Sequence, residues 1–284
     1  ERLPAEKITN ILSRLHAKLG ICWEEAAVTI CTTDTYPKGS ARTATINGKK
    51  IKIAGIAKGS GMIAPDMATM LAFIFTDAAI SKSEFQKLLL RTADKTFNSI
   101  TVDSDTSTND SVIAFATGLA GNKNNYTIDD KEMTLFCDAI EGVMRDLAHQ
   151  IVRDGEGASK FIEITISGAE NNVSARSIGL GIANSPLVKT AIAGEDANWG
   201  RIIMAVGKTS ERINVKELAL NIGGVQIAQS GSVIPGYEEE PVAKHMKEQE
   251  ILIKVDVGVG PGLATVWTCD LTHEYISINA DYRS

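Results

Sequence analysis

Cysteine and histidine are scarce in this sequence of 284 residues, and neither sign of charge is in large excess. Its four cysteines lie far apart in mostly apolar surroundings and form no CxxC pair. This pattern argues against a disulfide framework and favours reduced core thiols. The four histidines are equally dispersed, so neither HxxxH nor Cys/His spacing predicts a zinc site. We therefore look for chemistry that needs no metal.

Long apolar runs and clustered basic residues are also missing. No apolar run approaches the roughly 18 residues that a membrane helix needs, and the opening ERLPAEKITN lacks the basic-then-apolar pattern of a signal peptide. The formal net charge is -6 and Lys and Arg are scattered, which argues against a nucleic-acid partner. With 44% apolar and 23% charged residues, the composition predicts a globular, soluble and cytoplasmic protein.

Apolar periodicity predicts a mixed α/β architecture built in layers. Asn47-Gly48 between two alternating segments predicts a hairpin, and Ser81 with Glu84 forms a capping box. Helical spacing occurs over residues 8–19, 81–97, 130–152, 171–184 and 198–208. Further strands are expected at MLAFIFTDA, FIEITISGA, ELALNIGG, ILIKVDVG, ATVWTCDL and EYISINA.

Residues 57–72, AKGSGMIAPDMATMLA, carry the candidate chemistry. Gly59, Gly61 and Ala64 match a G-x-G-x-x-A dinucleotide fingerprint, with Asp77 at the end of the next apolar run. However, only about eight residues separate the last of these glycines from that run, too few for the helix of a Rossmann unit. A dinucleotide loop is therefore disfavoured.

The segment TVDSDTSTND places Asp103, Asp105 and Asn109 at alternate positions, like the start of a calcium loop. It has Thr108 where such a loop needs glycine and Ala114 where the bidentate glutamate belongs. Calcium is therefore disfavoured. Two interpretations stay open, namely a polar turn whose side chains cap local backbone and a loop next to an active site.

Thr69 taken alone is typical of a core threonine whose hydroxyl bonds a nearby carbonyl. Its neighbourhood, KGSGMIAPDMATML, resembles the KG-x-GMI-x-P-x-MATML signature of the ornithine acetyltransferases, also called bifunctional glutamate N-acetyltransferases. The resemblance covers nearly the whole chain, because it continues through TTDTYPK (32–38), TVDSDTSTND, RDGEGASK (153–160), AGEDANWGR (193–201) and ISINADYRS.

The resemblance implies a self-processing αββα sandwich of the N-terminal-nucleophile kind. Residues 1–68 would be the C-terminal part of an α segment that ends at the cleavage site. Residues 69–284 would be the β segment that starts with the nucleophile, with a second lobe around 160–284. The family's oxyanion hole comes from a Thr-Gly pair in a motif that precedes ERLP. This chain is therefore expected to be a fragment that lacks the N-terminal third of a longer protein.

The resemblance also implies that the chain cleaves itself between Ala68 and Thr69, and that Thr69 becomes the nucleophile. The hydroxyl of Thr69 can attack the preceding carbonyl through a five-membered ring, which gives an ester that water hydrolyses. The freed α-amine titrates near pH 7.7–8.0 in model peptides, as a general base for its own hydroxyl should. Such a base contributes roughly 10²- to 10⁴-fold. In this scheme the preceding glycines and proline form a tight turn that presents the Ala68 carbonyl to Thr69.

The implied activity is ping-pong acetyl transfer from N²-acetylornithine to glutamate through an acetyl-threonine intermediate, in arginine biosynthesis. The resemblance adds acetyl-CoA as a minor donor and an α2β2 heterotetramer of processed chains, and the chemistry requires no metal or organic cofactor. The residue types at the matched positions suit substrate binding: a lysine can bind the α-carboxylate, a glutamate can bind an ammonium, and small polar groups can make the remaining contacts. The positions that match the family's substrate-binding residues are Thr32, Lys58, Thr69, Glu156, Asn279 and the terminal Ser284.

Two other functions stay open. A related self-processing fold could use its N-terminal nucleophile as an aminopeptidase or amidohydrolase, because only the exclusion of water from the acyl-enzyme separates transfer from hydrolysis. The chain could also be a non-catalytic binding or structural subunit. A product assay with and without glutamate separates a transferase from a hydrolase, and the intact mass of the natural protein tests the subunit hypothesis.

Overall fold

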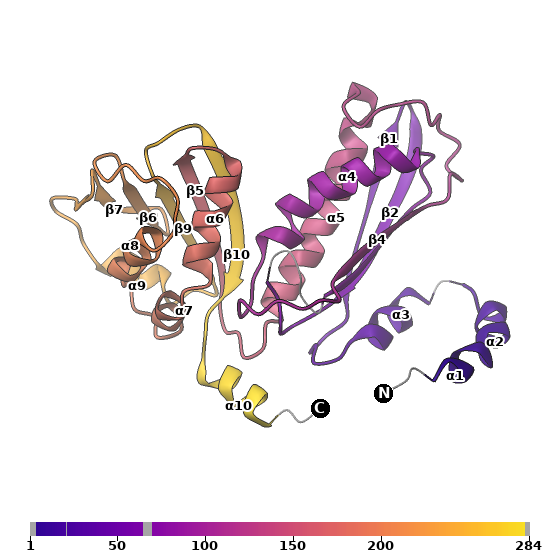
Figure 1. Ribbon diagram of the computed structural model, residues 1–284, viewed down its shortest axis with the longest axis horizontal. Helices are drawn as coiled ribbons and strands as arrows, with labels where there is room; N and C mark the ends of the chain where they lie inside the picture. The colour runs from indigo at the N-terminus through magenta and orange to yellow at the C-terminus, as the bar shows by residue number, and fades with distance from the viewer. Residues whose placement is uncertain (1–3, 21, 65–69, 282–284) are drawn as a thin grey trace.

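The computed structural model describes residues 4–20, 22–64 and 70–281. Two β-sheets, each with helices packed against it, form two lobes that lie side by side (Figure 1). The prediction of mixed α/β layers is therefore confirmed. The assignment of residues 1–68 and 69–284 to separate segments depends on a bond outside the described residues and stays a prediction.

The first sheet has the strand order β1-β2-β3-β4. Its strands are β1 (Lys38–Ile46), β2 (Lys49–Lys58), β3 (Leu71–Thr76) and β4 (Ser111–Ala116). β1 and β2 form the predicted hairpin, in which Asn47 and Gly48 have φ of 45° and 78°, the backbone that Asn-Gly turns favour. β3 is antiparallel to β2 and parallel to β4. A Rossmann unit needs parallel neighbours joined by a helix, so the dinucleotide interpretation of the loop between β2 and β3 is excluded.

Helix α5 (Thr134–Arg153) lies against β1 and β2 and carries the core of the first lobe. Its buried face includes Ile140, Val143, Leu147 and Ile151, which follow the predicted helical spacing. Only the serine half of the predicted capping box forms: the Ser81 hydroxyl accepts from the Glu84 N–H at the start of α4, whereas the Glu84 carboxylate accepts from Lys87 and from the Ile128 N–H. The other elements of this lobe are α4 (Lys82–Lys95), α3 (Trp23–Ile30), η1 (Phe97–Ser99) and η2 (Lys131–Met133).

The second sheet has the strand order β10-β5-β9-β6-β7-β8, and helix α6 packs on β10 and β5. Its strands are β5 (Phe161–Ala169), β6 (Ala219–Ile222), β7 (Val225–Gln229), β8 (Ser232–Val233), β9 (Glu250–Asp256) and β10 (Gly262–Cys269). Its helices are α6 (Asn172–Ala183), α7 (Pro186–Ala193), α8 (Trp199–Gly207) and α9 (Glu240–His245).

The two lobes share apolar contacts where β5 and β10 begin and end. Phe161 and Trp267 belong to the same buried cluster as α5. His149 of α5 packs between them, with its ring centroid 5.2 Å from Phe161 and 4.6 Å from Trp267. Burial, followed by the charge of nearby Arg153, lowers the pKa of His149 to about 4, so the ring is neutral at neutral pH. This junction orients the turn between α5 and β5.

Two sequence predictions were wrong. EYISINA is a helix, α10 (His273–Asp281), which continues beyond the end of β10 (Figure 1). Ile276 is 64% exposed and no described residue of α10 is buried, so its alternating apolar residues face no core. A helix bonds its own backbone groups without a neighbouring strand. Residues 8–19 form two short helices, α1 (Ala5–Thr9) and α2 (Leu12–Ala17), which bury no side chain and so lack the packing that sustains a long helix.

Gly55 of β2 faces α5 so closely that a methyl group there has no room. A Cβ atom would lie 2.8 Å from Leu147 Cδ1 and 2.9 Å from Ile74 Cδ1. Gly55→Ala is therefore expected to lower the free energy of unfolding by about 1–3 kcal/mol through overpacking. Urea denaturation measures the change. The matched control is Gly39→Ala in β1, where the Cβ atom would meet its nearest atom at 3.8 Å. Equal stabilities of the two variants would contradict this packing argument.

Candidate active site

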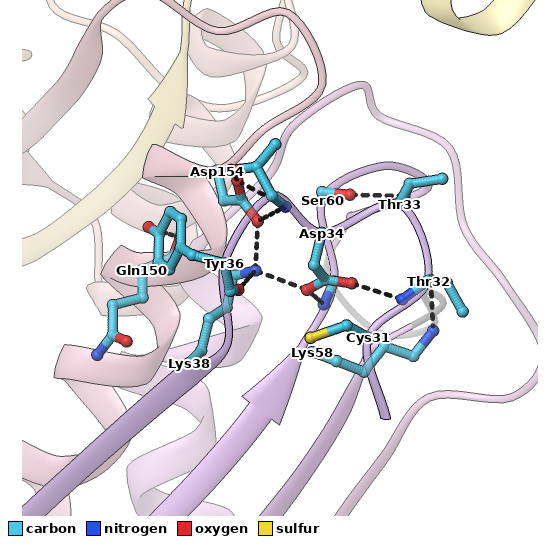
Figure 2. Close-up of polar contacts among 12 residues, drawn as sticks. Cys31, Thr32, Thr33, Asp34, Tyr36, Lys38, Lys58, Ser60, Gln150 and Asp154 are labelled. Carbon is cyan, nitrogen blue, oxygen red and sulfur yellow. Dashed lines mark hydrogen bonds and ion pairs between the residues drawn. The ribbon is translucent and has the colours of Figure 1, made fainter. Parts of the chain in front are cut away.

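Four of the predicted substrate-binding side chains come together from four segments of the chain. Thr32 follows α3, Lys58 ends β2, Glu156 lies in the turn after α5, and Asn279 lies in α10. The Nζ of Lys58 is 3.4 Å from the Thr32 hydroxyl, as Figure 2 shows. Asn279 Nδ2 donates to Glu156 Oε2 at 2.9 Å. The N–H of Glu156 donates to the carbonyl of Ser60, two residues after Lys58, which links the two pairs.

Lys58 is a buried ammonium. The residue is 6% exposed, and no carboxylate oxygen of the described residues lies within 4.0 Å of its Nζ. Burying a charged group without a partner is expensive, so such a group is usually neutralised by a ligand or by charges nearby. The end of β2 therefore has the properties of a site for a carboxylate.

Glu156 lies opposite a glycine that leaves room for its carboxylate. A Cβ atom at Gly61 would overlap the Glu156 carboxyl group, so the loop after Lys58 can approach the turn only because this side chain is absent. Gly157 has φ of 71° and its Cα faces the backbone of Tyr275 in α10. Gly61 and Gly157 thus allow the loop after Lys58, the turn after α5 and helix α10 to meet around Glu156.

The TVDSDTSTND segment lies beside this site, as the second of its two interpretations requires. Asp103 accepts the N–H groups of Met62 at 2.7 Å and of Ile63 at 3.0 Å, and it also caps local backbone at Asp105. Burial raises the pKa of Asp103 above its usual value despite these bonds. The hydroxyl of Tyr275 donates to the same carboxylate at 3.3 Å, and burial raises the pKa of that tyrosine too. Asp103 therefore joins the glycine-rich loop to α10.

A second aspartate of this segment holds the other side of the cleavage motif. Asp110 Oδ1 accepts the N–H of Met70 at 2.5 Å. The backbone that precedes and the backbone that follows residues 65–69 are thus both bonded to one segment, 101–110. Ala68, Thr69 and Ser284 lie outside the described residues, so their predicted roles stay predictions.

A buried ionic network that was not predicted from the sequence joins the TTDTYPK motif to Asp154 of the RDGEGASK motif. Lys38 Nζ lies 2.6 Å from Asp34 Oδ1 and 2.5 Å from Asp154 Oδ2 (Figure 2). Asp34 also accepts the N–H groups of Gly59 at 2.7 Å and of Thr32 at 3.1 Å. Burial raises the pKa of Asp34, but the bonds from Gly59 and Lys38 outweigh it, so the pKa lies below its usual value. Aspartate and lysine four residues apart in a motif that also holds Thr32 were the available signal.

Other sequence predictions concern metals, thiols and membranes. No group of three or more His, Cys, Asp or Glu within the described ranges is placed to hold a metal ion. All four cysteines are free, but only Cys137 and Cys269 are buried, whereas Cys22 is exposed. The prediction that all four are core thiols is therefore wrong for Cys22, which lies just before α3 at the surface. None of the helices in the described part of the chain is long and apolar enough to cross a membrane.

Comparisons with known proteins agree with the motif resemblance. The ArgJ family model matches residues 1–284. The arginine biosynthesis bifunctional protein ArgJ of Zymomonas mobilis subsp. mobilis is 54% identical over 282 residues, which cover 99% of this chain and 69% of that protein. The protein of the same name from Ruegeria pomeroyi is 55% identical over 285 residues, which cover 100% and 68%. A crystal structure of ArgJ from Bacillus halodurans superposes with a TM-score of 0.72 at 41% identity and covers 75% of this chain and 100% of that chain.

The low pKa of Asp34 predicts a pH dependence of stability. A carboxylate with a lowered folded pKa contributes stability above its unfolded pKa of about 3.9, and this contribution is lost as the pH falls through the lower folded pKa. Asp34→Asn is expected to lower the free energy of unfolding at pH 7 and to flatten its acid decline below about pH 4. Urea denaturation at several pH values measures this. Asp129→Asn, which removes the 81% exposed partner of Arg91, is the control and should change little. Parallel pH curves for Asp34→Asn and the wild type would contradict the assignment.

Proposed function

Because this chain belongs to the ArgJ family and is a glutamate N-acetyltransferase of arginine biosynthesis, we propose a role for each described residue of the site. In this proposal Thr69 carries the acetyl group from N²-acetylornithine to glutamate. The observation that supports it most is the buried Lys58, which lacks a carboxylate partner among the described residues and lies beside the Thr32 hydroxyl. Ammonium and hydroxyl together suit the α-carboxylate that both substrates carry.

Glu156 and Asn279 form the other end of the proposed substrate site. The carboxylate of Glu156 suits the side-chain ammonium of ornithine, and the amide of Asn279 holds that carboxylate in place at 2.9 Å. Glutamate brings a carboxylate to the position where ornithine brings an ammonium. This end is therefore where the two half-reactions differ, while the Lys58 end serves both.

The proposed chemistry uses one nucleophile twice. The Thr69 hydroxyl attacks the acetyl carbonyl of N²-acetylornithine, the α-amine of the same residue takes its proton and passes it to the departing ornithine amine, and an acetyl ester remains. The amine of glutamate then attacks this ester and the threonine hydroxyl is restored. The hydrogen bonds that the N–H groups of Met62 and Met70 donate to Asp103 and Asp110 support this role, because they fix the backbone on both sides of residues 65–69.

Several finer features are part of the same proposal. We expect autocatalytic cleavage at Ala68-Thr69, a heterotetramer of two α and two β segments, a cytoplasmic location and acetyl-CoA as a minor acetyl donor. The mechanism needs no cofactor. Because the relatives are named for arginine biosynthesis, neither the aminopeptidase or amidohydrolase alternative nor a non-catalytic subunit is favoured.

Glu156→Gln tests the ammonium site. We expect the KM for N²-acetylornithine to rise about tenfold or more, because a hydrogen bond between charged groups contributes about 1.5–3 kcal/mol. Cleavage at Ala68-Thr69 should continue, since the carboxylate is assigned to binding alone. Steady-state kinetics of ornithine release and the masses of the two chains measure both effects.

The matched control is Glu170→Gln, which alters an exposed carboxylate that pairs with Arg212 in the second lobe, outside the site. Its KM should stay at the wild-type value. A Glu156→Gln enzyme with unchanged kinetics in both half-reactions would remove Glu156 from the substrate site.

A further inference from the structure

Lys38 lies at the centre of a buried ionic trio between the two ends of the candidate site. Its side chain is 0% exposed, and those of Asp34 and Asp154 are 0% and 2% exposed. Both carboxylates lie within 2.6 Å of its Nζ (Figure 2). The Tyr36 ring lies 4.9 Å from the same nitrogen and closes one side. None of these groups has a role in the proposed chemistry.

The Asp34 side of the trio holds the end of the site that is proposed to bind the substrate carboxylate. Its two oxygens accept the N–H of Thr32 and the N–H of Gly59, the residue after Lys58. Both residues that are assigned to the substrate carboxylate are therefore fixed through a single aspartate. Movement of Asp34 would shift Thr32 and Lys58 together.

The Asp154 side of the trio holds the ammonium end. Asp154 accepts the N–H and the hydroxyl of Thr35, and it precedes Glu156 by two residues in the turn after α5. The N–H of Glu156 in turn donates to the Ser60 carbonyl. The Lys38 ammonium thus bridges two parts of the site. One is the segment next to Lys58, which binds the substrate carboxylate, and the other is the turn with Glu156, which binds the substrate ammonium.

The carboxylates of the trio are not available to the neighbouring Lys58. Both are paired with Lys38, and they also accept the N–H groups of Gly59 and Thr35. An apolar trio of similar volume would fill the space without desolvating three charges. What the ionic trio adds is fixed direction and distance, with carboxylates that are occupied and so leave the Lys58 ammonium available to a ligand.

We propose that Lys38 is a positioning residue that sets the separation of Lys58 and Glu156, and thereby the preference for a donor with an ammonium at its far end. This inference rests on the proposed function, in which those two residues bind the two charged ends of N²-acetylornithine. A misplacement of about 1 Å can cost ~10²-fold in rate, so loss of the bridge should be felt most by the substrate that is held at both ends.

The test compares two donors in the processed full-length enzyme. N²-acetylnorvaline has the carbon chain of N²-acetylornithine but lacks the far ammonium. The measured quantity is kcat/KM for N²-acetylornithine divided by kcat/KM for N²-acetylnorvaline. This ratio reports the use of Glu156, and it does not change with the fraction of folded enzyme, because that fraction cancels. Lys38→Met is expected to lower this ratio by about tenfold or more. A structural role alone would lower both values equally.

Three further variants complete the test. Thr35→Val removes one hydroxyl donor to Asp154 and should lower the ratio by about threefold even if Lys38→Met fails to fold. Lys160→Met is the control, since this buried lysine pairs with Glu195 in the second lobe, and its ratio should equal that of the wild type. If Glu156→Gln lowers the ratio but Lys38→Met and Thr35→Val leave it unchanged, the positioning role is overturned. If Glu156→Gln itself leaves the ratio unchanged, the assignment of Glu156 is wrong and the inference falls with it.

Discussion

A buried ammonium at the end of β2 is the constraint on which the candidate site depends. Lys58 is buried from water, and no carboxylate of the described residues pairs with it. The carboxylates of the nearby trio of Lys38, Asp34 and Asp154 are occupied by Lys38 and by backbone N–H groups. The fold therefore keeps one positive charge buried and open to an anionic ligand. A carboxylate that both substrates share meets this requirement.

The two lobes bring the two ends of the site together. The first sheet and α5 carry Lys58 and the turn with Glu156, whereas the second sheet delivers α10 with Asn279 through β10. The apolar junction of His149 with Phe161 and Trp267 fixes where β5 and β10 meet α5. The segment between β10 and α10 is also bonded directly to the turn, because the Thr272 hydroxyl donates to the Gly157 carbonyl. The geometry of the site is therefore a consequence of inter-lobe packing as well as of its own hydrogen bonds.

Sequence patterns predicted the elements whose signals are local. The hairpin at Asn47-Gly48, the Ser81 cap and the buried face of α5 follow from turn chemistry and periodicity. The alternating apolar residues of ISINA led to a wrong strand prediction. Such a segment forms a strand only where the edge of a neighbouring strand is available, and that depends on tertiary structure. Thr32, Lys58, Glu156 and Asn279 came from motif resemblance. The bridge from Lys38 to Asp154 spans 116 positions, and no local rule predicts a contact of that separation.

The central claim is that one threonine carries the acetyl group between two substrates that bind in the same place. The direct measurement is mass spectrometry of the full-length protein before and after exposure to N²-acetylornithine without glutamate. The account predicts a β segment whose N-terminal peptide begins TMLAF and gains the mass of one acetyl group, with ornithine released in equal amount and the acetyl group lost when glutamate is added. An active enzyme with an uncleaved chain, or transfer to glutamate with no acetylated threonine at any stage, would contradict it.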